Sequence, residues 1–190
     1  MSRPLVALGL CLVVAASAWF ILGHQRGGIQ PRLQPLPQSV PANGVVVRVV
    51  DGDTVQVKVD GATEPVRLIG VDTPETVDDR KPVQCFGPEA SARTKSLLPP
   101  GTAVRLERDA EARDKYGRLL AYLYRASDGL FVNLVLVRDG FGSVLLIEPN
   151  VTYASIFRDA QADARQKGAG LWGVCGEPGR AAAPSTTRAG

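Results

Sequence analysis

Residues 44–60 read Gly44-Val-Val-Val-Arg-Val-Val-Asp-Gly-Asp-Thr-Val-Gln-Val-Lys-Val-Asp60. Valine recurs at every second position on both sides of Asp51-Gly52-Asp53, and this period of two predicts two β-strands. Asp-Gly is a strong hairpin signal, so we expect Gly52 to adopt a positive φ in the turn. A second turn at Gly61-Ala62 leads to a third apolar run over residues 66–71. This part of the chain therefore predicts a three-stranded meander.

The remaining elements follow from helix signals and short apolar runs. Gly87-Pro88-Glu89 opens a helix that we expect to end near Leu98, because proline is favoured in the first helical turn and Pro99-Pro100-Gly101 stops it. We expect strands around Val104 and Leu106 and over Leu119–Tyr124, a short buried helix over Phe131–Arg138, and an amphipathic helix from Tyr153 to Gly168. This order predicts the α+β class, with a five-stranded OB-fold β-barrel and about three packed helices.

A cluster of charged residues ends the third apolar run. Residues 67–75 read Arg67-Leu-Ile-Gly-Val-Asp-Thr-Pro-Glu75. The guanidinium suits phosphate oxygens, and the two carboxylates can bind a hard cation or accept a proton. Packing does not explain carboxylates on both sides of a Thr-Pro step, so we interpret this stretch as part of a site. Asp51-Gly-Asp53 and Asp114-Lys-Tyr-Gly-Arg118 are the candidates for its other parts.

Each of these residues taken singly also has a structural interpretation. Asp-Gly is first of all a turn dipeptide, and Arg67 is explained as a strand residue whose guanidinium reaches solvent. Arg118 is explained as a cation that closes a turn, Glu75 as a surface acid, and Tyr116 as an aromatic that covers the end of a barrel. The site interpretation therefore depends on whether the three clusters come together.

Length and charge limit the class of protein. The 190 residues allow one domain with appendages, and the net charge of +3 is compatible with a polyanionic partner. This excess is too small to act as a diffuse basic field, so a phosphate site must come from local arrangement. The only histidine, His24, lies beside the N-terminal apolar segment, which excludes zinc sites and Ser-His or Cys-His catalysis.

The first 26 residues contain an uncharged apolar segment, Pro4–Gly23. Its length matches the roughly 20 residues of a membrane-spanning helix, whereas Ala16-Ser17-Ala18 resembles a signal-peptide cleavage site. We expect an uncleaved signal anchor over residues 1–26, with a cleaved signal peptide as the alternative. Both interpretations place the remaining chain outside the cytoplasm, either membrane-anchored or secreted.

The rest of the chain divides by composition. Residues 27–43 are rich in proline and predict an extended linker, residues 44–176 form the domain, and residues 177–190 predict a disordered tail. Cys85 and Cys175 are the two cysteines outside the N-terminal segment. We expect them to form a disulfide, with two unpaired buried thiols as the alternative.

Four motifs give the chain a specific resemblance. They are Asp51-Gly-Asp-Thr54, Arg67-Leu-Ile-Gly-Val-Asp-Thr-Pro-Glu75, Gly87-Pro-Glu-Ala-Ser91 and Asp114-Lys-Tyr-Gly-Arg-Leu-Leu-Ala-Tyr122. In this order they resemble the signature segments of the staphylococcal nuclease (thermonuclease) family over residues 44–173. The resemblance implies an SNase-like OB fold and a calcium-dependent nuclease that hydrolyses phosphodiester bonds of DNA and RNA and leaves 3′-phosphate ends.

The same resemblance implies a metal site. Asp53, Asp72 and the backbone carbonyl of Thr73 would bind Ca²⁺, which prefers oxygen ligands, and water and substrate phosphate would complete its coordination. Asp51 would be an outer charge that does not bind the metal.

The resemblance also assigns the residues that act on the substrate. Arg67 and Arg118 would bind phosphate oxygens as negative charge gathers on them in the transition state. Glu75 would accept a proton from the attacking water or orient it. Lys115 and Tyr116 would contact a neighbouring phosphate.

The chain departs from the family where its best-known member has tyrosines that stack on the nucleotide. Residues 144–149 read Val144-Leu-Leu-Ile-Glu-Pro149. Base stacking on an aromatic ring is worth about 1–3 kcal/mol, so we expect weaker binding or altered base preference. The sequence suggests Leu146→Tyr as the variant that tests this.

A catalytically inactive OB-type module that binds nucleic acid or protein is the alternative function. Such a module would need none of five residues that this chain has: Asp53, Arg67, Asp72, Glu75 and Arg118. The expected partners are DNA and RNA, together with a membrane through the N-terminal segment. Nothing in the sequence implies a protein partner, and we expect a monomer.

Overall fold

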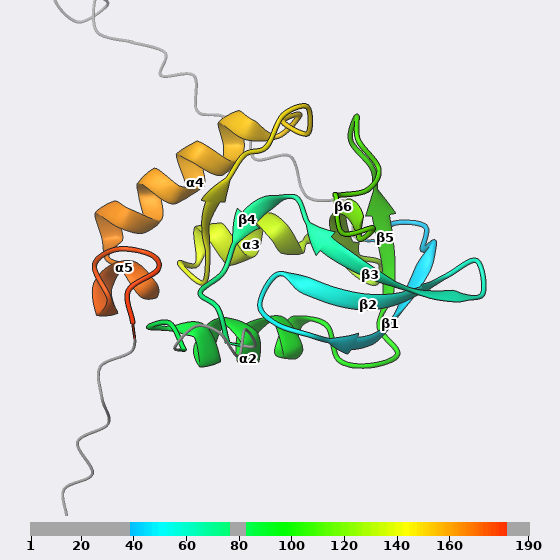
Figure 1. Cartoon of the computed structure of the whole chain (residues 1–190), viewed down its shortest axis with the longest axis horizontal. Coiled ribbons are helices and arrows are strands. Elements are labelled where there is room, and N and C mark those ends of the chain that lie inside the picture. Colours follow the sequence, from blue (N-terminus) through cyan, green and yellow to red (C-terminus); the bar gives the residue numbers. More distant parts are fainter. Residues whose placement is uncertain (1–38, 77–82, 182–190) are drawn as a thin grey trace, which may run out of the picture. The chain divides into compact units, whose positions relative to one another are not determined.

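The structure is a computed structural model that describes residues 39–76 and 83–181. Its main sheet consists of β1 (Gly44–Val49), β2 (Thr54–Val59), β3 (Ala62–Leu68), β5 (Ala103–Glu107), β6 (Leu119–Arg125) and β7 (Leu130–Phe131). The strands are hydrogen-bonded in the order β3-β2-β1-β5-β6-β7, and β3 also pairs in parallel with β6. This last pairing closes β1, β2, β3, β6 and β5 into the predicted five-stranded barrel (Figure 1).

Helices pack beside the barrel. They are α2 (Gly87–Leu97), α3 (Val132–Arg138), α4 (Ala154–Lys167) and the four-residue α5 (Leu171–Val174). The α3 helix lies between α2 and α4 and contacts both (Figure 1). Three longer helices with one short addition confirm the predicted α+β arrangement.

The third predicted strand is interrupted at Ile69, just before Gly70. Instead of one strand over residues 66–71, β3 ends at Leu68 and a separate strand, β4 (Gly70–Asp72), pairs with β8 (Ser143–Leu145). Gly70 has φ +82°, and a Cβ on it would lie 2.5 Å from the Phe157 ring. The positive φ and the close contact explain why glycine stands there and why the chain changes direction after Arg67.

The turn between β1 and β2 also differs from the prediction. Gly52 does not have the expected positive φ, because the backbone around Asp51–Asp53 is not a two-residue hairpin turn of that type. A Cβ on Gly52 would lie 2.5 Å from Thr73 Oγ1. Glycine is required there by the close approach of Thr73, which brings the turn against the end of β4.

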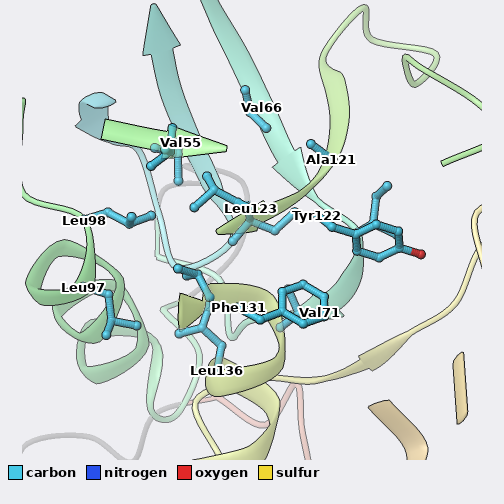
Figure 2. Packing of buried hydrophobic residues seen from close by; sticks show 14 of the residues in the cluster. Val55, Val66, Val71, Leu97, Leu98, Ala121, Tyr122, Leu123, Phe131 and Leu136 are labelled. Carbon is cyan, nitrogen blue, oxygen red and sulfur yellow. The ribbon is translucent and has the colours of Figure 1, made fainter. Parts of the chain in front are cut away.

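Apolar residues from the barrel and the helices share one core. Figure 2 shows barrel residues such as Val55, Val66 and Leu123 facing the same space as Leu97 of α2 and Leu136 of α3. All five are buried. At the usual ~25 cal/mol per Å² of apolar surface removed from water, burial of this kind supplies the main driving force for the fold.

A buried asparagine joins α3 to the barrel. Asn133 Oδ1 accepts the Leu123 N–H at 2.9 Å, and its Nδ2 donates to the carbonyls of Ile69 and Ala121 at 2.8 and 3.2 Å. Ile69 is the residue between β3 and β4. The asparagine therefore satisfies the backbone where the strand breaks, close to Arg67.

The C-terminal part is fastened to the start of α2. The predicted disulfide is present between Cys85 and Cys175. Leu171 and Trp172 are buried in the same small cluster, as expected for residues that hold the chain end on the domain. Residues 180 and 181, which the sequence places in a disordered tail, pair with residues 85 and 84.

The N-terminal predictions concern residues that lie mostly outside the described part. This holds for the signal anchor or signal peptide (residues 1–26) and for the linker up to residue 38. The last linker residues contact the barrel, where Val40 N donates to Ala126 O at 3.0 Å and Asn43 N to Val104 O at 2.9 Å. Within residues 39–76 and 83–181, the longest apolar helices are too short to cross a bilayer.

Candidate active site

Arg67 joins two of the predicted metal ligands. Its Nε lies 3.2 Å from Asp53 Oδ1, and its Nη2 donates to Asp72 Oδ1 at 3.0 Å. Its Nη1 donates to the carbonyl oxygens of Leu68 and Val71 at 2.9 and 2.7 Å. The Asp53 side chain is 9% exposed and the Asp72 side chain 53%. The guanidinium therefore neutralises a buried carboxylate on one side and reaches an exposed carboxylate on the other.

Asp53 is held by the end of β4. Its Oδ2 accepts hydrogen bonds from the backbone N–H and the hydroxyl of Thr73, at 2.9 and 3.1 Å, and its Oδ1 accepts one from the Thr54 hydroxyl at 3.2 Å. The adjacent Gly52 carbonyl accepts a hydrogen bond from Thr94 Oγ1 of α2 at 2.6 Å. Three elements that are distant in sequence thus fix the position of one carboxylate.

Asp51 adds a second carboxyl group to this turn. Its Oδ1 accepts the backbone N–H groups of Asp53 and Thr54 at 3.0 and 2.7 Å. Burial, with added repulsion from Asp53 and Glu75, raises the pKa of Asp51 to about 6, although its two backbone hydrogen bonds oppose the shift. The negative charges of three carboxylates therefore accumulate here, which favours a bound cation.

The raised pKa of Asp51 predicts a pH-dependent stability. Because its pKa is higher in the folded than in the unfolded protein, its contribution is fully favourable below about pH 4 and is lost as the pH rises through about 6. We compare the change in the free energy of unfolding that Asp51→Asn causes at pH 8 with the change that it causes at pH 4. We expect the change to be more stabilising at pH 8 by about 1–2 kcal/mol, after a discount for partial exposure. Urea titrations in chelator measure this difference, and parallel pH profiles for the two proteins would contradict it.

Glu75 lies in the loop that follows β4. Its backbone N–H donates to Gln84 Oε1 at 2.9 Å, its carbonyl accepts the Gln84 N–H at 3.0 Å, and its Oε1 accepts the Thr76 N–H at 2.8 Å. Its charge is the smallest of the contributions that raise the pKa of Asp51. Gln84 therefore holds the backbone of Glu75 through both its side chain and its main chain.

Arg118 is carried by a turn that Asp114 organises. Asp114 Oδ1 accepts the backbone N–H groups of Tyr116 and Arg118 at 2.9 and 3.0 Å, and Oδ2 lies 2.7 Å from Arg118 Nε. The base of the turn is tied to β3 by Arg113, whose guanidinium makes two contacts with Glu64 at 3.0 and 3.1 Å. These bonds hold the turn ready before a ligand binds.

The side chains of this turn form a cationic group around one ring. Tyr116 is 73% exposed, so it does not cover the barrel end. The Lys115 ammonium lies 5.1 Å and the Arg118 guanidinium 5.6 Å from the centroid of its ring. An exposed ring with two cations over it is suited to contact a phosphate and the adjoining sugar or base.

A pocket of about 440 Å³ joins the two arginine regions. Arg67 and Arg118 both line it, together with Lys115 and Tyr116. Its apolar wall includes Ile69 and Leu120, together with Leu145 at the end of β8 and Ile147 just after it. The pocket therefore combines cations that attract phosphate with an apolar wall that can contact a base.

The sequence suggested Leu146 for the base contact, and the pocket lining suggests its neighbours instead. Leu145 and Ile147 line the pocket, whereas Leu146 is not among its lining residues. Side chains alternate along β8 and its continuation, so neighbours point to opposite sides. The period of two was present in the sequence, but β8 has only three residues and its pairing with β4 was not foreseen.

The donor set fits a hard cation. Asp53 and Asp72 converge on one guanidinium, and Thr73 follows directly with a backbone carbonyl. These oxygens suit Ca²⁺, and the exposure of Asp72 leaves room for water or substrate. No group of three histidine, cysteine, aspartate or glutamate side chains placed to hold a metal occurs in residues 39–76 and 83–181.

Comparison with known proteins agrees with this geometry. A family model described as staphylococcal nuclease homologue matches residues 65–174. The chain is 45% identical over 128 residues to a thermonuclease of Staphylococcus intermedius, and the aligned region covers 67% of this chain and 74% of that protein. It is 41% identical over 167 residues to a thermonuclease of Staphylococcus hyicus, covering 88% and 97%.

A relative outside that genus is similar over a comparable length. The chain is 40% identical over 141 residues to the endonuclease YncB of Bacillus subtilis, covering 73% of this chain and 65% of that protein. The matched family model includes Arg67, Asp72, Glu75 and Arg118, and the structure has the closed barrel with packed helices. The chain therefore belongs to the staphylococcal nuclease family.

Proposed function

We propose that this protein is a calcium-dependent nuclease that hydrolyses phosphodiester bonds of DNA and RNA and leaves 3′-phosphate ends. The observation that carries the proposal is the direct connection between Asp53, Arg67 and Asp72, with Arg67 and Arg118 on one pocket. Thermonucleases and an endonuclease among the relatives support the same reaction class.

Arg67 and Arg118 bind the scissile phosphate in this proposal. Arg67 is paired with the buried Asp53 and the exposed Asp72, and Arg118 is paired with Asp114. A phosphate that carries more charge in the transition state competes better for them than it does in the ground state, which is what lowers the barrier. Lys115 and Tyr116 hold a neighbouring phosphate from the other side of the pocket.

Asp53, Asp72 and the Thr73 carbonyl would hold the calcium. Bound there, the ion would polarise the phosphate and offset the charge of the attacking oxygen. Glu75, which lies two residues after Thr73 in the chain, accepts the proton of the attacking water. Departure of the 5′ oxygen in line with the attack leaves the phosphate on the 3′ end.

Digestion of plasmid DNA and of RNA by the purified protein tests the proposal. We expect cleavage with Ca²⁺, its loss in chelator, and its return when Ca²⁺ is restored, with Mg²⁺ as the comparison ion. Fragments should resist extension by a polymerase until a phosphatase removes the 3′-phosphate. Cleavage that persists in chelator would overturn the role of the metal, and the absence of cleavage under all conditions would favour the inactive binding module.

The apolar wall of the pocket predicts weak discrimination among bases. We expect Leu145→Tyr to strengthen binding of single-stranded DNA about tenfold, because a ring at this 39% exposed position adds stacking worth about 1–3 kcal/mol. Fluorescence anisotropy with a short oligonucleotide, in chelator to prevent cleavage, measures the affinity. Leu146→Tyr is the matched control, and an equal gain in both variants would show that the added ring acts outside the pocket.

We also propose an extracytoplasmic location. The disulfide supports it, because such bonds form and persist in oxidising compartments. The N-terminal apolar segment would deliver the domain there, as an anchor or as a cleaved signal, and the mass of the mature protein distinguishes the two. A monomer is the assembly state proposed.

A further inference from the structure

The backbone of Glu75 is held by one residue, Gln84, through its side chain and its main chain. Gln84 Oε1 accepts its N–H at 2.9 Å, and the Gln84 N–H donates to its carbonyl at 3.0 Å. The first residue of α2 packs against the same peptide, since a Cβ on Gly87 would lie 3.0 Å from the Glu75 carbonyl oxygen. The position of the carboxylate in this loop therefore depends on residues that are separate from the metal ligands.

Gln84 is in turn fastened to the C-terminal end of the domain. It forms a β-bridge with Ala181, and the next residue, Cys85, donates its N–H to Arg180 O at 2.7 Å. Arg180 Nη1 donates to Cys175 O at 3.1 Å, and Cys175 is bonded to Cys85. These contacts connect Glu75, through Gln84 and Cys85, with residues 175–181, about 100 residues further along the chain.

We propose that Gln84 is a positioning residue for Glu75 and that the Cys85–Cys175 disulfide keeps it in place, so that full activity requires the oxidised protein. The inference rests on the proposed role of Glu75. Misplacement of a catalytic group by about 1 Å can cost on the order of a hundredfold in rate, so loosening one loop is enough to lower kcat. Arg67 and Asp53 are held by contacts with β3, β4 and the residue after β4, and Arg118 is held by the Asp114 turn, so substrate affinity should be kept.

Gln84→Ala is the first test, because it removes the acceptor of the Glu75 N–H but keeps the backbone bonds of residue 84. We expect kcat to fall about tenfold with KM within about twofold of wild type. If Gln84 acts through Glu75, the loss should vanish in a Glu75→Gln background, measured at high enzyme concentration. Equal losses in both backgrounds would overturn the proposal.

Glu177→Ala is the matched control. This residue lies in the same C-terminal segment and pairs with Arg165 at 3.0 Å, away from Gln84 and Cys85. Its loss should leave kcat and KM unchanged. A fall in kcat equal to that of Gln84→Ala would mean that any disturbance of the C-terminal segment acts alike, which contradicts a specific role for Gln84.

Reduction of the full-length protein is the second test. An added phosphine donates two electrons to the disulfide, and one water supplies the oxygen of the resulting phosphine oxide and the two protons of the resulting thiols. We expect kcat to fall at least as far as in Gln84→Ala and to recover on reoxidation, whereas Cys85→Ser with Cys175→Ser should be low under both conditions. A reduced protein that stays folded by circular dichroism and keeps wild-type kcat would overturn the redox dependence.

Hydrogen exchange at the Glu75 amide gives a readout that does not need cleavage. Protection of this amide should fall at least tenfold in Gln84→Ala and in the reduced protein, while amides of β2 and β3 keep theirs. Unchanged protection would overturn the proposal even in an active enzyme. Lost protection in a protein that cleaves nothing would instead count against the proposed function alone.

Discussion

Glu75→Gln is expected to lower kcat by about two to four orders of magnitude, the usual contribution of a general base. Glutamine keeps the size and the hydrogen-bonding oxygen of the side chain but cannot take a proton. KM should change little, because the residues that bind phosphate, Arg67 and Arg118, line the pocket without Glu75. Steady-state cleavage of a fluorescent dinucleotide or of plasmid DNA in Ca²⁺ measures both constants.

Glu89→Gln is the control for this change. Glu89 is an exposed acid in the first turn of α2, a short distance along the chain from Glu75. It should retain full activity. A loss of less than tenfold in Glu75→Gln would show that the side chain orients water through its oxygen rather than accepting the proton, since the amide can still perform the first task.

The largest expected effect on stability comes from replacing Cys85 and Cys175 together with alanine. The bond closes a loop with a sequence separation of 90 residues. Loop-closure entropy predicts about 4–5 kcal/mol for a loop of this length, and measured losses are typically about 2–4 kcal/mol, so we expect the free energy of unfolding to fall by about 3–4 kcal/mol. The melting temperature should fall by roughly 10 °C.

Urea denaturation of the variant and of wild type, each with and without reductant, measures the change. Reductant should lower the stability of wild type to that of the variant and leave the variant unaffected. Cys11→Ser removes the third cysteine while keeping the bond, and it should match wild type. Equal stability of the variant and the oxidised wild type would show that the cross-link contributes nothing to the domain.

The order of strands and helices was predictable because it depends on local pattern. Valine at every second position predicted strands at β1 and β2, and both occur there. The buried face of β1 was not predictable in this way, because Val45 and Val47 are exposed, Val46 and Val49 are buried, and the pairing register shifts between Val46 and Arg48. Pro88 marks the start of α2 for an equally local reason, since its missing N–H costs nothing in the first helical turn. The five expected strands and their order relative to the helices then indicated the barrel.

The candidate site was predictable only in part. The charges near Arg67 are adjacent in sequence, and resemblance to the family supplied roles for them. The bonds of Arg67 to the carbonyls of Leu68 and Val71 were not foreseen, because they require the change of direction at Gly70. In the sequence, a glycine is the main sign that a backbone position has a positive φ, as at Gly70. Glycine has a second use, however, because Gly52 has no positive φ and stands where Thr73 packs closely.

By itself, the sequence determined the barrel strands, the helices and the identity of the charged residues, because these depend on neighbours within a few positions. The tertiary structure alone decided which atoms meet. It placed Asp53 against Thr73, put Leu145 rather than Leu146 in the pocket, and brought Gln84 to the backbone of Glu75. Contacts of this kind join segments that are distant in sequence. How closely these segments lie depends on the packing of the whole core, which no local sequence pattern encodes.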